Sequence, residues 1–198
     1  MARLLSVLIA LCGSLAASMA ADGTLMKSPS PDGRLALRIV APSGDEFAER
    51  KVDLIEKQSG TVVVDLATTP GGYVARTTLV WSADGTRVAY GTRGDKEGEV
   101  RTFFRNGSAF EEVQLPDNLP DPDIKFDKNA GAVKNYGGAV TVLRWLKSGE
   151  LELSNDLVML SRDNGRTYTG TVTFTIAFDA HHHPSVHHVG KTRTRVDE

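Results

Sequence analysis

The sequence predicts an all-β protein built from about three four-stranded antiparallel meanders. Two observations point to this fold class. Apolar and polar residues alternate with a period of two, and Asp-Gly, Asn-Gly and Ser-Gly turns separate the alternating segments. A third observation is repetition, because the same strand–turn–strand pattern occurs around residues 30–37, 81–90 and 145–151. A lone sheet of this kind cannot bury both of its faces, so we expect the copies to stack.

The first two units, at about residues 24–70 and 77–115, have the clearest pattern. In the first unit we expect strands at residues 24–28, 35–40, 52–56 and 61–66. In the second unit we expect strands at residues 77–81, 86–92, 100–105 and 108–115, with an Asn-Gly turn joining the last pair. Each unit therefore has the order strand, tight turn, strand, loop, hairpin.

The third unit, at about residues 139–178, follows a long connection at residues 116–138 that contains three prolines and four aspartates. Its expected strands are residues 139–146, 150–154, 157–161 and 168–178. After the last strand we expect a polar, histidine-rich tail at residues 181–198.

The first 20 residues have the pattern of a secretory signal peptide. Arg3 is their only charge, an apolar run over residues 4–11 follows, and small residues precede a cleavage site after Ala20. That run is about half as long as the roughly 20 residues of a membrane-spanning helix, which favours a cleaved signal over an anchor. We therefore expect an exported protein, periplasmic or extracellular.

Composition excludes several classes of function. The net charge of −2 gives no basic surface of the kind that binds nucleic acid. No stretch after the signal is long and apolar enough for stable membrane insertion. The single cysteine, Cys12, lies within the signal, so the mature chain has no thiol for catalysis. Residues 21–180 have the length of one all-β domain.

The turns Ser-Pro-Asp-Gly at residues 30–33 and Trp-Ser-Ala-Asp-Gly at residues 81–85 each precede an alternating apolar strand. In this they resemble the blade motif of TolB-like periplasmic β-propellers, a WD-type repeat. The resemblance implies stacked blades and a role as a protein-binding platform. Closed propellers have about 4 to 8 blades, more than this chain encodes. The units therefore form an open, partial propeller-like stack, close a ring by oligomerising, or curl into a β-sandwich.

All five histidines lie within residues 181–188. Neutral imidazoles are common ligands of Zn, Ni and Cu, so His181, His183, His187 and His188 are the candidate metal ligands. Pro184 opposes a helix that would align two of them, and no His-Glu-x-x-His pattern is present. The alternative is that these residues are only part of a polar tail.

The residue patterns of other known sites are missing. The four aspartates of the long connection do not have the spacing of an EF-hand, and no Gly-x-Ser-x-Gly elbow or glycine-rich phosphate loop occurs. The adjacent Glu111 and Glu112 point to opposite faces of a strand and cannot share a substrate. We therefore predict no catalytic residues and no cofactor.

The aromatic residues are interpreted as packing groups. Trp81 and Trp145 occupy equivalent places in two units, which is typical of a repeated core position. Phe103 and Phe104 are adjacent in a strand, so we expect them to face away from each other and one of them to be exposed.

The sequence as a whole predicts an exported, non-catalytic binding or scaffolding module with a protein or a glycan as its ligand. Loops at one end of the stack, at residues 42–50, 93–98 and 116–138, would carry the binding surface. The alternative is a metal-binding protein, or a metal-dependent enzyme, that uses the histidine tract.

Overall fold

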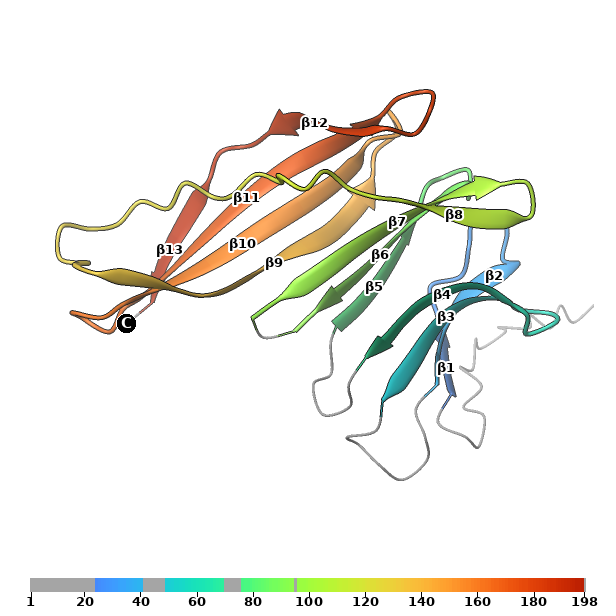
Figure 1. Cartoon of the computed structure of the whole chain (residues 1–198), viewed down its shortest axis with the longest axis horizontal. Helices are drawn as coiled ribbons and strands as arrows, with labels where there is room; N and C mark the ends of the chain where they lie inside the picture. Colours follow the sequence, from blue (N-terminus) through green and yellow to red (C-terminus); the bar gives the residue numbers. More distant parts are fainter. Residues whose placement is uncertain (1–23, 41–48, 70–75, 95, 198) are drawn as a thin grey trace, which may run out of the picture.

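A computed structural model describes residues 24–40, 49–69, 76–94 and 96–197. Within these ranges the chain forms thirteen strands in three antiparallel sheets and no helix (Figure 1). The predicted all-β fold of stacked meanders is therefore confirmed, as an open stack that is not closed into a barrel. The predicted signal peptide and most of the 42–50 loop lie outside the described residues.

The first and second sheets are the first two predicted units. Each is a simple meander in which neighbours in sequence are neighbours in the sheet. The strands of the first sheet are β1 (Thr24–Lys27), β2 (Leu35–Val40), β3 (Arg50–Glu56) and β4 (Val62–Thr69). The strands of the second are β5 (Arg76–Trp81), β6 (Arg87–Arg93), β7 (Gly98–Asn106) and β8 (Ala109–Val113).

The third sheet has five strands and differs from its prediction. They are β9 (Val133–Trp145), β10 (Leu151–Ser161), β11 (Thr167–Phe178), β12 (Pro184–Val189) and β13 (Arg193–Asp197), where β12 and β13 both pair with β11. The expected break at residues 155–156 was wrong, because both polar side chains have partners inside β10: the Asn155 amide donates to the Pro120 carbonyl, and Asp156 pairs with Arg93.

The expected tail at residues 181–198 was also wrong. Two short strands occupy most of it, and their side chains are mostly polar and exposed because they lie at the edge of the sheet. Likewise, the expected connection at residues 116–138 ends earlier, since β9 begins at Val133.

A glycine corner joins the first and second strands of every sheet. Gly33, Gly85 and Gly149 have φ values of 72°, 69° and 88°, which a residue with a side chain rarely adopts. In the third corner the Gly149 N–H donates to the Leu146 carbonyl at 3.0 Å, as the Gly85 N–H does to the Ser82 carbonyl at 3.0 Å. The three predicted turns therefore occupy the same position in three successive meanders.

The second sheet is the middle layer of the stack. On one side Val88, Tyr90 and Phe103 pack against the first sheet, and on the other side Ala89 packs against the third. Both faces of this sheet are therefore buried. For this reason Phe103 and Phe104 are 2% and 3% exposed, and the expectation that one of them would be exposed was wrong.

One hydrogen bond is repeated between successive sheets. The Trp81 Nε1–H donates to the Ser28 carbonyl at 3.0 Å, and the Trp145 Nε1–H donates to the Val80 carbonyl at 3.2 Å. Each tryptophan is the last residue of the first strand of its sheet. Each acceptor carbonyl lies shortly before the glycine corner of the preceding sheet. The step from the first sheet to the second is thus repeated from the second to the third.

Candidate functional site

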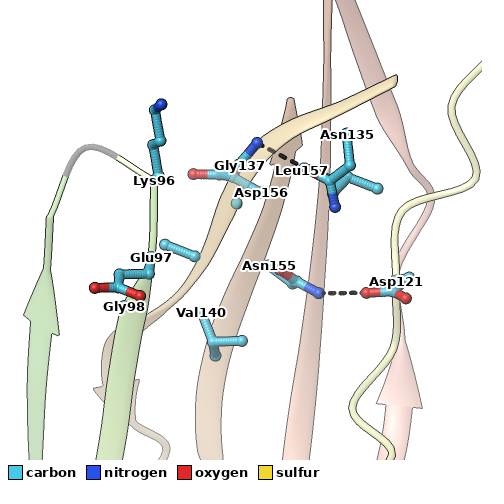
Figure 2. A pocket seen from close by; sticks show the side chains of 12 residues that line it. Lys96, Glu97, Gly98, Asp121, Asn135, Gly137, Val140, Asn155, Asp156 and Leu157 are labelled. Carbon is cyan, nitrogen blue, oxygen red and sulfur yellow. Dashed lines mark hydrogen bonds between the residues drawn. The ribbon is translucent and has the colours of Figure 1, made fainter. Parts of the chain in front are cut away.

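Two of the three predicted loop regions meet at a groove on the third sheet. The loop between β6 and β7 lies on one side, and the connection between β8 and β9 lies on the other (Figure 2). The groove has a volume of about 340 Å³ and is open to solvent. We call it the β9–β10 groove, because Asn135, residues 137–140 and residues 155–157 of these strands line it.

The β8–β9 connection is held across the same face of the third sheet that the second sheet covers (Figure 1, yellow). Ile124 packs beside Tyr168, where Gly170 makes room: a Cβ on this glycine would lie 2.4 Å from Ile124 Cγ1. The Tyr168 hydroxyl donates to Asp127 at 2.8 Å, which lowers the pKa of that carboxyl. The connection therefore forms a fixed wall of the groove.

The β6–β7 loop forms the opposite wall by seating on two glycines of β9. The Gly138 N–H donates to the Lys96 carbonyl at 3.0 Å. A Cβ on Gly137 would lie 2.9 Å from Lys96 Cα, so a side chain there would displace the loop. At the start of β7, a Cβ on Gly98 would lie 3.0 Å from the Ala139 Cβ. The Gly-Gly pair is thus a docking point for the loop.

Polar side chains converge on the groove above an apolar floor of Val140 and Leu157. The Asn155 side chain is 8% exposed, and its Nδ2 donates to the Pro120 carbonyl and to Asp121, both at 3.0 Å. Figure 2 shows this amide directed across the groove to Asp121. The described residues provide no hydrogen bond to Asn155 Oδ1.

The remaining polar groups of the groove are held in place to different degrees. Asp156 accepts from Arg93 and from the Thr171 hydroxyl, each at 2.7 Å. Asn135 Oδ1 accepts from the Gly137 N–H at 2.8 Å. Beside them stands Tyr136, which is 51% exposed and lies with its ring 4.8 Å from Lys96 Nζ. Lys96 has no ion pair among the described residues.

The candidate metal ligands are spread over a turn and a strand. His181 and His183 lie in the turn before β12 with ring centroids 6.0 Å apart, and the His183 ring nitrogen contacts Asp179 at 3.1 Å. His187 contacts Glu150, and His188 pairs with Thr175 across the β11–β12 ladder. Among the residues that the structure describes, no three histidine, cysteine, aspartate or glutamate side chains form a group that could hold a metal ion.

The fifth histidine belongs to an aromatic cluster between the second and third sheets. The His182 ring lies 4.6 Å from that of Phe104, which in turn contacts Trp145 and Phe178. Arg87 lies over the Phe104 ring at 5.2 Å and donates to the Gly149 carbonyl at 2.6 Å. This cluster fastens the two sheets to each other.

The groove residues were not predicted individually. Asn135 and Tyr136 were placed in the long connection, and Asn155 in a break between strands. The available signal was the polar run at residues 154–156 inside an otherwise alternating apolar segment. Such a run in a buried strand indicates side chains with specific partners.

Comparison of the sequence with models of protein families finds no match, and a search of curated proteins also finds none. The resemblance to TolB-like propellers therefore stays a prediction. The described part of the chain contains no helix that is long and apolar enough to cross a membrane.

Proposed function

We propose that this chain is an exported, non-catalytic binding module whose ligand occupies the β9–β10 groove. The observation that carries the proposal is the convergence of two separate loops on one groove lined with hydrogen-bonding groups. Preformed concave sites that present a few oriented polar groups are the usual form of a ligand site. Export is inferred from the first 20 residues of the sequence alone.

The polar groups of the groove support binding rather than catalysis. Asp156 is already engaged by Arg93 and Thr171, and Asp121 by Asn155. No serine, cysteine or histidine is among the residues that line the groove, so the pairing of a serine or cysteine nucleophile with a histidine base does not occur in it. What remains is a set of oriented donors and acceptors.

The test compares how much ligand is retained by the immobilised native protein and by a variant whose groove is filled by a large side chain. We expect the native protein to retain material from the exported fraction of its host, and an Asn135→Trp variant to retain roughly tenfold less. Leu143→Trp is the matched control, because Leu143 is an exposed residue of the same strand outside the groove. Thermal unfolding of each variant checks that the fold is intact.

Equal retention by the native and Asn135→Trp chains would contradict the proposal. A second blocking variant, Lys96→Trp, fills the groove from the opposite wall. It shows whether a loss of retention comes from blocking the groove or from a local disturbance around residue 135. Loss of retention in both variants, with full retention by the Leu143→Trp control, is the expected result.

A further inference from the structure

The groups of the groove point to one class of ligand. They comprise two side-chain amides, from Asn135 and Asn155, together with carboxylates and one ammonium group. Amides and carboxylates are planar groups that accept or donate two hydrogen bonds side by side. Neighbouring hydroxyl groups on a sugar ring present donors and acceptors in that same side-by-side arrangement.

Tyr136 adds the apolar half of such a site. Tyr136 is 51% exposed, stands in the chain between the groove-lining residues Asn135 and Gly137, and lies with its ring against the groove-lining Lys96. An exposed aromatic ring buries the apolar face of a flat ligand while the hydroxyls at the ligand's edge bond to polar groups. The Lys96 ammonium lies over one face of this ring, 4.8 Å from its centroid, so the opposite face is the one on which a ligand would stack.

The charge of the groove disfavours an anionic ligand. Three carboxylates, from Glu97, Asp121 and Asp156, line it against the single ammonium of Lys96. Arg93 neutralises only one of them, Asp156, at 2.7 Å. A ligand that carries a carboxylate or a phosphate would meet like charge in this groove, whereas a neutral ligand would not.

An extended peptide is the other ligand that such a groove would attract, and the backbone geometry opposes it. A peptide that adds a strand to a sheet needs free N–H and C=O groups along an edge. β9 is the edge strand here, but beside the groove the Gly138 N–H is already bonded to the Lys96 carbonyl. The β6–β7 loop thus occupies the place where a peptide strand would pair.

We propose that the β9–β10 groove binds a neutral carbohydrate, with Asn155 and Asn135 bonding to its hydroxyls and Tyr136 stacking on one ring. This assignment rests on the proposed function of the same groove. The volume of about 340 Å³ lies at the small end of ligand sites, so the groove accommodates one or two sugar units of a longer chain.

The test is a titration of the isotope-labelled protein, followed by NMR, with the neutral disaccharides cellobiose and maltose as probes. We expect at least one of them to shift the side-chain amide signals of Asn135 and Asn155. Glucuronic acid, which is anionic at neutral pH, is expected to bind roughly tenfold more weakly than a neutral sugar. A Tyr136→Ala variant is expected to lose about tenfold in affinity, since it removes the stacking surface.

The matched control is Leu143→Ala, which removes another exposed apolar side chain from β9 outside the groove and is expected to change affinity less than about twofold. The assignment is overturned if no neutral disaccharide shifts the two amide signals. It is also overturned if Tyr136→Ala binds as well as the native chain.

An unfolded polypeptide, the oxidised insulin B chain, separates failure of this assignment from failure of the proposed function. If this probe shifts the Gly137 and Gly138 amide signals and the sugars shift none, the groove binds a ligand but the carbohydrate assignment is wrong. If the sugars fail and the groove-filled variants retain as much material as the native chain, both proposals fall.

Discussion

The side chains of the repeated corner act on their own backbone. The Ser82 hydroxyl donates to Asp84 at 2.6 Å, and the Thr86 N–H donates to the same carboxylate oxygen at 3.0 Å. These bonds lower the pKa of Asp84 to about 2, with the serine hydroxyl as the larger cause. Ser30 and Asp32 repeat the arrangement, and the pKa of Asp32 is lowered in the same way.

We expect the charge of Asp84 to stabilise the fold in a pH-dependent manner. Because its folded pKa lies below the unfolded value, the contribution is complete above about pH 4 and is lost as the pH falls through about 2. Asp84→Asn should therefore cost about 1 kcal/mol at neutral pH, after allowance for the screening of an exposed group, and little near pH 2. Urea unfolding at the two pH values measures this.

Asp117→Asn is the control for this prediction. Asp117 is exposed and forms no hydrogen bond or ion pair among the described residues, so its substitution should leave stability unchanged at both pH values. A cost for Asp84→Asn that is the same at neutral pH and near pH 2 would show that the charge is not the stabilising feature.

At the scale of elements, the repeated tryptophan bond sets the spacing between sheets. Trp81 and Trp145 end equivalent strands and donate to equivalent carbonyls, so they join the sheets by the same contact. The predicted equivalence of the two tryptophans is borne out by these contacts. Their role is to link neighbouring sheets as well as to fill space, since both side chains are only partly buried.

We expect Trp81→Phe and Trp145→Phe to lower the free energy of unfolding by similar amounts, about 1–2 kcal/mol each. Phenylalanine keeps an aromatic ring in place and loses the N–H donor, so the cost is that of one hydrogen bond and some ring area. Denaturant unfolding measures it. A difference of more than about 2 kcal/mol between the two variants would contradict the equivalence of the two contacts.

The sequence was sufficient to predict the first two sheets and insufficient for the third, for reasons that lie in particular elements. Turn chemistry is local, so the Asp-Gly, Ser-Gly and Asn-Gly turns predicted the β1–β2, β3–β4, β5–β6 and β7–β8 hairpins. In β10, by contrast, the partners of Asn155 and Asp156 come from Pro120 and Arg93, far along the chain. No local signal indicates such tertiary partners, so the polar pair Asn155–Asp156 had the pattern of a break between two strands.

The same reasoning applies to the groove. Its two loops were predicted as surface features, but their meeting depends on how the β8–β9 connection crosses the third sheet. The seating of Ile124 over Gly170 sets that course, and the seating of the Lys96 backbone over Gly137 places the β6–β7 loop on the other side. Glycine positions of this kind have no distinctive pattern in a single sequence, because each gains its meaning only from the segment that approaches it.

At the scale of the whole molecule, the stack ends in a polar face. Phe174 and Ile176 of β11 point toward the second sheet, so the alternating threonines of the same strand point away from it. These threonines are residues 167, 169, 171, 173 and 175. Terminal repeats in stacked proteins characteristically carry a polar outer face, which favours an open stack that ends at this sheet.

The layering also predicts how the molecule opens. Val88, Ala89 and Tyr90 are fully buried because β6 lies in the middle sheet, which is covered on both sides, whereas the residues of β13 are mostly exposed. Amides of elements buried on both faces exchange only when neighbouring layers separate, and edge strands exchange by local fraying. We expect hydrogen exchange followed by mass spectrometry to give β6 and β7 the slowest rates and β13 rates at least roughly tenfold faster. If peptides from β6 exchanged as fast as those from β13, the second sheet would not be the shared core of the stack, and the rigid walls that the groove requires would lose their support.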